Sequence, residues 1–309
     1  MVKKVLFIGS KNLGLRVLEK IYTLAPKILS AVVTFDDQSD SRTVLKELKR
    51  FCQSQKIDFF VLDKPSKLKK IILKIRPDLC IIVGWYWRIQ GDVLKLTPGS
   101  FIGVHGSLLP KYRGFCPLVW AMINGEKKTG VSLFYFTDNI DEGAIIAQEQ
   151  FKISDEDTIQ NLLIKAEKSA IKIFDKNYML LIDNKSSKIQ QKKSSMSYGS
   201  RRIPQDGLIN WRDGPRNIYN FIRAQTRPYP GAFTYNGKNQ KVYIWKAKPF
   251  NVKLHGMPGQ VCIIDNRAIV ACLGGGIILE EIQIDKKIIN KPEKVLKFDE
   301  RFKEHNQNL

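Results

Sequence analysis

The sequence has few histidines and few cysteines, and neither residue type forms a familiar metal or redox motif. The 309 residues contain three histidines and five cysteines, and no two cysteines have CxxC spacing. An odd number of unpaired cysteines argues against a disulfide framework, so we expect reduced thiols, mostly in the core. We expect no metal ion. Cys116 lies near His105 in sequence, but nothing around it predicts the activated thiolate that a nucleophile needs.

Long apolar runs are also missing. No window approaches the roughly 20 apolar residues that a membrane-spanning helix needs, so we expect no membrane span. The start, MVKKVLFIGS, resembles a signal peptide for a few residues, but Asn12, Arg16 and Glu19 follow at once. We therefore expect a buried first strand in a cytoplasmic protein. The length predicts two domains.

Positive charge is in excess. The chain carries 51 basic and 30 acidic residues, a net charge of +21, spread over both halves. Such a balance is typical of proteins that meet nucleic acid, a membrane surface or an acidic substrate. A general enrichment in Lys, Ile and Asn explains the same charge without any partner.

Apolar and amphipathic segments alternate through the first half of the chain. Continuous apolar runs such as KVLFIG (4–9) and DLCIIVG (78–84) are typical of strands buried on both faces. The alternation predicts an α/β fold with a parallel sheet and helices on both faces. Further strands are expected at 29–35, 57–62, 101–104, 130–136 and 144–153, and helices at 13–24, 43–55, 67–76, 115–124 and 155–177.

The second half of the chain changes character after residue 183. Residues 184–205 are polar and basic, which predicts a linker. After a helix at 216–225, short strands with NG, DN and GGG turns predict a small antiparallel barrel or sheet. We therefore expect one domain at 1–183 and a smaller β-rich domain at 206–309. The last 15 or so residues are expected to form a polar tail.

Ligands of parallel sheets bind beyond the carboxyl ends of the strands. The WYW cluster (85–87) follows one such strand and predicts either core filling or a platform for an aromatic ligand; we favour the ligand. The turn at Lys11 and Asn12 joins a strand to a helix and is either a phosphate site or a plain turn. It is not GxGxxG, so it does not predict a dinucleotide site.

His105 and Asp141 each follow a strand that we place in the same parallel sheet, so their loops are expected side by side. A carboxylate that accepts a proton from one imidazole nitrogen fixes the tautomer and leaves the other nitrogen as a base. This pair is the candidate for proton transfer beside an anionic substrate.

The motifs HGSLLPKYRG (105–114), NGEKKTGVSLF (124–134) and DEGAIIAQ (141–148) resemble those of the formyltransferases that use 10-formyltetrahydrofolate. The resemblance continues at SYGSRRIPQDGLINW (197–211) and IRAQTRPYPGAFTY (222–235), so it covers most of the chain. The family implies a Rossmann-like catalytic domain followed by a smaller barrel-type domain.

The resemblance implies that His105 is the catalytic histidine and Asp141 its partner. The implied reaction is attack of a substrate amine on the formyl carbon of 10-formyltetrahydrofolate. By the same analogy the site is bordered by Trp85, Tyr86, Trp87, Leu109, Asp138 and Ile140. Groups expected to meet a diphosphate-linked substrate are Lys11, Asn12, Arg88, Lys111, Arg113 and Arg201. For Arg113 a structural role, tying the loop down, is the alternative.

One position departs from the family pattern. Members usually have an asparagine two residues before the histidine, whose amide helps to bind the oxyanion. This sequence has Gly103 there, which offers no side-chain donor. If only the donor is missing, Gly103→Asn is expected to raise or preserve turnover.

Two subclasses fit the resemblance. Nucleotide-sugar N-formyltransferases are favoured, because HGSLLPKYRG, RRIPQD and RPYPGAF resemble the domain that acts on UDP-4-amino-4-deoxy-L-arabinose. Methionyl-tRNA formyltransferases would suit the charge, and only they imply a nucleic-acid partner; they normally have a long basic loop where this chain has DDQSDSR (36–42). A homologue that binds without turnover, and an RNA-binding protein, are the non-enzyme alternatives. A homodimer is an open alternative to a monomer.

Overall fold

The computed structural model describes residues 1–98 and 100–303, and their contacts divide the chain into two compact units. Unit 1 comprises Met1–Pro117, Lys128–Lys152 and Leu163–Ser200. Unit 2 comprises Leu118–Lys127, Ile153–Leu162 and the described residues from Arg201 onward. These boundaries differ from the expected ones, since residues 184–200 belong to unit 1 and do not form a separate linker.

Unit 1 is built on a seven-stranded sheet with the order β3-β2-β1-β4-β5-β7-β8. Its strands are β1 (Val5–Gly9), β2 (Leu29–Phe35), β3 (Asp58–Leu62), β4 (Leu79–Val83), β5 (Phe101–His105), β7 (Lys128–Tyr135) and β8 (Ile145–Lys152). The first five pair in parallel, as expected. The parallel orientation expected for strand 130–136 is wrong. β7 runs antiparallel because the chain returns along β5, pairing His105 with Ser132, instead of crossing over the sheet.

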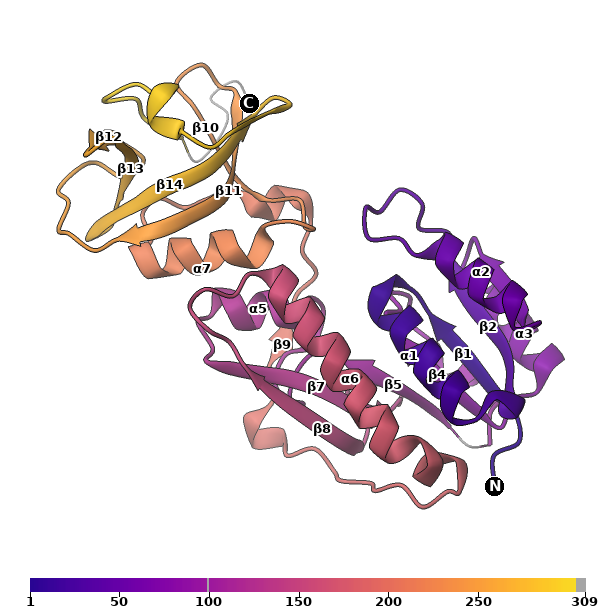
Figure 1. Ribbon diagram of the computed structural model, residues 1–309. Helices are drawn as coiled ribbons and strands as arrows, with labels where there is room; N and C mark the ends of the chain where they lie inside the picture. The colour runs from indigo at the N-terminus through magenta and orange to yellow at the C-terminus, as the bar shows by residue number, and fades with distance from the viewer. Residues whose placement is uncertain (99, 304–309) are drawn as a thin grey trace. The chain divides into compact units, whose positions relative to one another are not determined.

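The sequence explains why the middle of this sheet is buried. All five residues of β1 and all five of β4 are buried, as their continuous apolar runs require between two layers of helices. Figure 1 shows α1 lying along β1 and β4, and the three elements are in contact. The helices of this part of the chain are α1 (Lys11–Leu24), α2 (Leu45–Ser54), α3 (Lys67–Ile75) and α4 (Gly91–Leu94).

Two helices contribute residues to unit 2 as well. They are α5 (Pro117–Ile123) and the long α6 (Ile159–Ile182). α6 begins later than the expected residue 155 because Thr158 forms its cap: the Asn161 side chain accepts both the backbone N–H and the hydroxyl of Thr158, at 2.8 and 2.9 Å. Among the described residues no helix is long and apolar enough to cross a membrane.

Unit 2 is an antiparallel sheet packed on one helix, as the turn pattern predicted. Its strand order is β10-β11-β14-β13-β12, with β15 beside β14. The elements are α7 (Pro215–Gln225), β10 (Ala232–Tyr235), β11 (Lys241–Phe250), β12 (Val261–Ile264), β13 (Arg267–Cys272), β14 (Gly275–Ile284) and β15 (Lys287–Ile289). Asp265 and Asn266, with φ of 48° and 55°, turn β12 into β13 as a two-residue hairpin requires.

The end of the described chain is not the polar tail that we expected. Leu296 and Phe302 are 6 % and 3 % exposed and belong to the core of unit 2, where Phe302 packs against Trp211. Lys303 exchanges backbone hydrogen bonds with Tyr235, at 2.8 and 3.3 Å. Two buried apolar side chains and backbone hydrogen bonds thus hold the described part of this segment on unit 2; the rest of the expected tail lies outside the described residues.

The segment after α6 is ordered by backbone pairing with unit 1. Ile189 and Ile145 exchange backbone hydrogen bonds of 2.8 and 2.9 Å. Strand β9 (Tyr198–Gly199) pairs in parallel with β6 (Arg113–Gly114), which follows the HGSLLPKY motif. The polar composition hid this pairing, because the hydrogen bonds are made by the backbone. Short 3-10 helices complete the chain: η1 (Pro26–Ile28), η2 (Lys193–Ser195), η3 (Pro204–Gly207) and η4 (Pro292–Lys294).

Candidate active site

His105 is the last residue of β5, so it belongs to the strand and not to the loop after it. Its side chain is 9 % exposed. Its Nε2 lies 2.7 Å from the carbonyl oxygen of Tyr112. Because a carbonyl oxygen can only accept, Nε2 carries the proton, and the Nδ1 of the neutral ring holds the lone pair.

Asp141 lies on the Nδ1 side of this ring. Its Oδ2 accepts the backbone N–H of Gly114 at 2.7 Å and lies 3.4 Å from His105 Nδ1. Asp141 has a φ of 50°, a left-handed conformation that aspartate tolerates better than most side chains. The residues expected to pair are therefore brought together.

The reason for the pairing differs from the one we expected. β7 is antiparallel and ends with Tyr135 beside Ile102, near the start of β5. The loop at 136–144 reaches back from there, so that Asp141 Oδ2 lies 3.4 Å from His105 Nδ1. We also expected Asp141 to fix the tautomer. The Tyr112 carbonyl does so, which leaves His105 Nδ1 and Asp141 Oδ2 as neighbouring acceptors that a substrate N–H can approach together.

The space beside Gly103 is filled by an aromatic ring. A Cβ atom at Gly103 would overlap Cε2 of Phe136 and would lie 3.0 Å from the carbonyl oxygen of Ile82. Phe136 stacks on Phe134 with ring centroids 5.1 Å apart. An asparagine cannot be added at this position without moving the Phe136 ring.

The WYW cluster packs around Phe35 at the carboxyl ends of β2 and β4. The rings of Trp85, Tyr86 and Trp87 have centroids 5.2, 5.1 and 5.2 Å from that of Phe35. Trp85 and Trp87 also pack against the core, while Tyr86 is 45 % exposed. The indole N–H of Trp85 is buried and has no hydrogen-bond partner among the described residues. The cluster is thus partly core filling, with one buried donor left for another group.

Two of the other predicted residues, Leu109 and Ile140, are apolar and differ in exposure, and two more, Arg88 and Asp138, make polar contacts. Leu109 is 3 % exposed and packs with Phe134, so it is a core residue, whereas Ile140 is 50 % exposed. Arg88 donates to the backbone carbonyl of Asp138 at 3.2 Å, and the Asp138 carboxylate lies against the backbone of Gly91. These contacts tie the loop at 136–144 to the chain after β4.

The two residues expected at a diphosphate in the first turn are engaged within the protein. Lys11 is paired with Asp37 and, at 2.9 Å, with Asp40. Burial lowers the pKa of Lys11, but the hydrogen bonds to the two aspartates outweigh burial and raise it above 10.5. Asn12 donates to Glu167 at 2.9 Å. Asp37 and Asp40 thus neutralise the charge expected to meet phosphate.

Arg113 is the most enclosed of the predicted basic residues, with 1 % exposure. Its guanidinium donates to Gln191 and Tyr198. These contacts favour the structural alternative for Arg113, in which it ties the loop down. Lys111 is exposed beside it, and Arg201 is exposed and belongs to unit 2.

Comparison with known proteins agrees with the motifs. A family model described as formyl transferase matches residues 26–176, and one described as formyl transferase, C-terminal domain, matches residues 202–298. The methionyl-tRNA formyltransferase of Acetivibrio thermocellus is 30 % identical over 91 % of this chain and 92 % of its own length. The chain belongs to the formyl transferase family. This confirms the family that the sequence motifs resemble.

This formyltransferase is also similar to longer and to solved proteins. It is 36 % identical to the bifunctional polymyxin resistance protein ArnA of Wigglesworthia glossinidia brevipalpis over 93 % of this chain, but spans only 44 % of that protein's length. The structure of an N-formyltransferase from Helicobacter canadensis, in complex with folinic acid and dTDP-3-aminofucose, superposes with a TM-score of 0.69. That match covers 90 % of this chain and 99 % of the other at 22 % identity, so it shows the shared fold.

Sequence reasoning missed the residues that hold the pair in this formyltransferase. Tyr112 and Gly114 lie within the HGSLLPKYRG motif, but they act through backbone groups, which residue types do not reveal. Gln191, which donates to the Asp141 carbonyl, and Ser197, which accepts the backbone N–H of Tyr112, lie in the segment predicted to be a linker. No local pattern distinguishes them from their polar neighbours.

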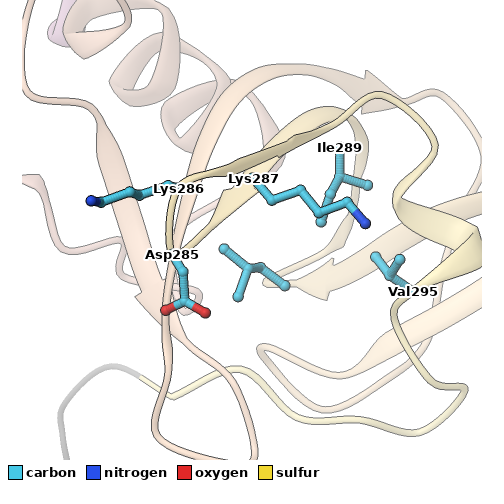
Figure 2. A pocket seen from close by; sticks show the side chains of 6 residues that line it. Asp285, Lys286, Lys287, Ile289 and Val295 are labelled. Atoms are coloured by element: carbon cyan, nitrogen blue, oxygen red, sulfur yellow. The ribbon is translucent and has the colours of Figure 1, made fainter.

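A separate open hollow of ≈ 550 Å³ lies on unit 2, at the turn between β14 and β15. Figure 2 shows the lining residues, with Lys286 and Lys287 pointing in different directions. The lining consists of Ile284, Asp285, Lys286, Lys287, Ile289 and Val295. All of these residues belong to unit 2, whereas His105 and Asp141 belong to unit 1.

Proposed function

We propose that this formyltransferase transfers a formyl group from 10-formyltetrahydrofolate to the amino group of a nucleotide-linked amino sugar. The observation that carries the proposal is the fixed tautomer of His105, with Nδ1 beside the Asp141 carboxylate. The donor supplies the electrophilic formyl carbon. The protein contributes a base at the end of β5 and a carboxylate that stabilises the protonated base.

The proton path follows from the same geometry. As the substrate amine bonds to the formyl carbon, it loses a proton to Nδ1 of His105, and Asp141 Oδ2 accepts a hydrogen bond from the imidazolium. His105 then returns the proton to the leaving nitrogen as the bond between that nitrogen and the formyl carbon breaks. General acid–base assistance of this kind contributes about 10²- to 10⁴-fold.

Binding of the folate donor is supported by the aromatic cluster. Trp85 has a buried indole N–H with no partner among the described residues, beside the exposed ring of Tyr86. A flat, polar heterocycle suits this combination, because it offers a stacking face and an acceptor. The Helicobacter canadensis enzyme of the same fold is described in complex with folinic acid.

The amino-sugar acceptor is favoured over methionyl-tRNA by one loop. The loop after β2 carries Asp37 and Asp40, whose carboxylates pair with Lys11. Arg42, the one basic residue of the loop at 36–42, pairs with Asp40, so the loop presents no unpaired cation to an RNA backbone, whose recognition depends on cations. The methionyl-tRNA alternative keeps the support of the net charge of +21 and of the similarity to the Acetivibrio thermocellus enzyme.

The test is an acceptor panel. The protein is incubated with 10-formyltetrahydrofolate and UDP- and dTDP-linked amino sugars or methionyl-tRNA, while folate release and formylated product are followed. We expect turnover with an amino sugar, loss of at least about 100-fold in His105→Ala, and no loss in the control His255→Ala, an exposed histidine of unit 2. Turnover with methionyl-tRNA alone would favour the second candidate. Binding of folate or nucleotide sugar without turnover of any acceptor in the panel would support the binding-only alternative.

A further inference from the structure

The segment after α6 reaches the loop that carries Asp141. Gln191 Nε2 donates to two backbone carbonyl oxygens of this loop, those of Asp141 and Gly143, each at 2.8 Å. One bond holds the carbonyl of Asp141 itself, whose carboxylate faces His105, and the other holds the carbonyl two residues later. Gln191 therefore fixes the backbone on which the Asp141 side chain turns.

The other end of the same amide is held by a buried cation. Gln191 Oε1 accepts from Arg113 Nε at 3.1 Å and from Arg113 Nη2 at 2.8 Å. Arg113 is 1 % exposed, so its guanidinium needs acceptors within the protein. An amide can accept from a guanidinium and donate to carbonyls at once, whereas a carboxylate has no donor and an ammonium no acceptor. The chemistry at position 191 thus requires a side-chain amide, which Gln191 supplies.

The same segment also holds Tyr112, whose carbonyl oxygen is the hydrogen-bond acceptor for His105. Ser197 Oγ accepts the backbone N–H of Tyr112 at 2.9 Å, and the Tyr112 carbonyl accepts from His105 Nε2 at 2.7 Å. The Ser197 carbonyl accepts the backbone N–H of Arg113 at 2.8 Å. Residues 191–197 therefore brace both members of the candidate pair from outside the strand that carries His105 and the loop that carries Asp141.

We propose that Gln191, backed by Arg113, is a positioning residue that holds Asp141 at His105 for proton transfer. The inference rests on the proposed function for its kinetic consequence, but its structural part stands alone. Asp141 has a φ of 50° and its Oδ2 must stay within reach of both Gly114 N and His105 Nδ1. A displacement of about 1 Å at such a site can cost on the order of 100-fold in rate.

The experiment uses two substitutions at Gln191 and the same two at its exposed neighbour. Gln191→Met keeps the length of the side chain but removes both the donor and the acceptor. Gln191→Glu keeps the acceptor for Arg113 but replaces the N–H donor that faces the two carbonyls by an oxygen. Gln190→Met and Gln190→Glu are the controls. Hydrogen exchange of the Gly114 amide, which is bonded to the Asp141 carboxylate, is measured in the full chain, together with kcat and KM for formyl transfer.

We expect Gly114 exchange to rise by about tenfold or more in both Gln191 variants, because a charge-assisted hydrogen bond is weakened. We expect kcat to fall by 10- to 100-fold, with KM changed by less than about threefold. The Gln190 controls should match the wild type in all three. Unchanged Gly114 exchange in a folded Gln191 variant would overturn the proposal, as would a rise in KM without a fall in kcat. If the wild type transfers no formyl group, the proposed function fails while the exchange result still decides the positioning role. If Gln191→Glu does not fold, Gln191→Met carries the test.

Discussion

The ring of Phe136 lies where a side chain at Gly103 would begin, so Gly103 on β5 and Phe136 at the start of the loop that carries Asp141 share one space. The absence of an amide two residues before His105 is therefore not a simple deletion. Phe136 stacks on Phe134 and packs against two clusters of buried apolar residues, one that contains Ile82 and one that contains Leu109. Gly103 and Phe136 are best treated as a pair.

Gly103→Asn is expected to lose stability, because the position differs from one where only the donor is missing and where turnover would be raised or preserved. The added side chain overpacks the site by more than a methylene, which typically costs 1–3 kcal/mol. Urea denaturation measures this loss. The double variant Gly103→Asn/Phe136→Ala makes room for the amide and should transfer formyl groups faster than Phe136→Ala alone. An unaltered stability of Gly103→Asn would contradict the packing argument.

Lys11 is expected to matter for stability more than for acceptor binding. Lys11→Met leaves Asp37, which is 7 % exposed, without its cation, and breaking a buried ion pair costs about 3 kcal/mol or more. Thermal and urea denaturation should show this loss, while KM for the nucleotide sugar changes by less than about threefold in the variant that remains folded. Lys95→Met, at an exposed lysine, is the control. A large rise in KM with little loss of stability would instead support a contact between Lys11 and the diphosphate of the substrate.

Asp40 should make stability depend on pH. Burial raises the pKa of this carboxyl, but hydrogen bonds from Arg42 and Lys11 outweigh burial and hold the pKa well below 3.8. A depressed folded-state pKa gives stability that is present above the unfolded-state value and is lost as the pH falls towards the folded-state value. The difference in free energy of unfolding between wild type and Asp40→Asn should therefore be largest near pH 7 and shrink below about pH 4. A difference that is constant from pH 7 to pH 3 would show that Asp40 acts through packing.

The sequence predicted the elements whose side chains carry a regular pattern. The apolar strands around Val5–Gly9 and Leu79–Val83 were predicted to within a residue or two, because full burial leaves no alternation to misread. The direction of β7 was not predictable, since an apolar strand reads alike in a parallel and an antiparallel pair. The packing of Phe302 at the end of the described chain was missed because its neighbours are charged.

The residues of the candidate site also divide into those that the sequence predicted and those that it did not. His105 and Asp141 are rare or charged residues in tight motifs, and the structure brings them together. Gln191 lies 50 residues from Asp141 in a polar segment, and its role depends on two backbone carbonyls that any residues could supply. The engagement of Lys11 by Asp37 and Asp40 was equally hidden, because opposite charges after neighbouring strands show no periodicity.

The most direct test of the account is a double-mutant cycle on His105 and Asp141, read as the single-turnover rate of formyl transfer. His105 and Asp141 act as one unit on one proton, so their contributions to the rate cannot be independent. His105→Ala should cost about 100-fold or more, Asp141→Asn a similar factor, and the double variant no more than the worse single variant. Rates that multiply, so that the double variant loses the product of the two factors, would contradict it.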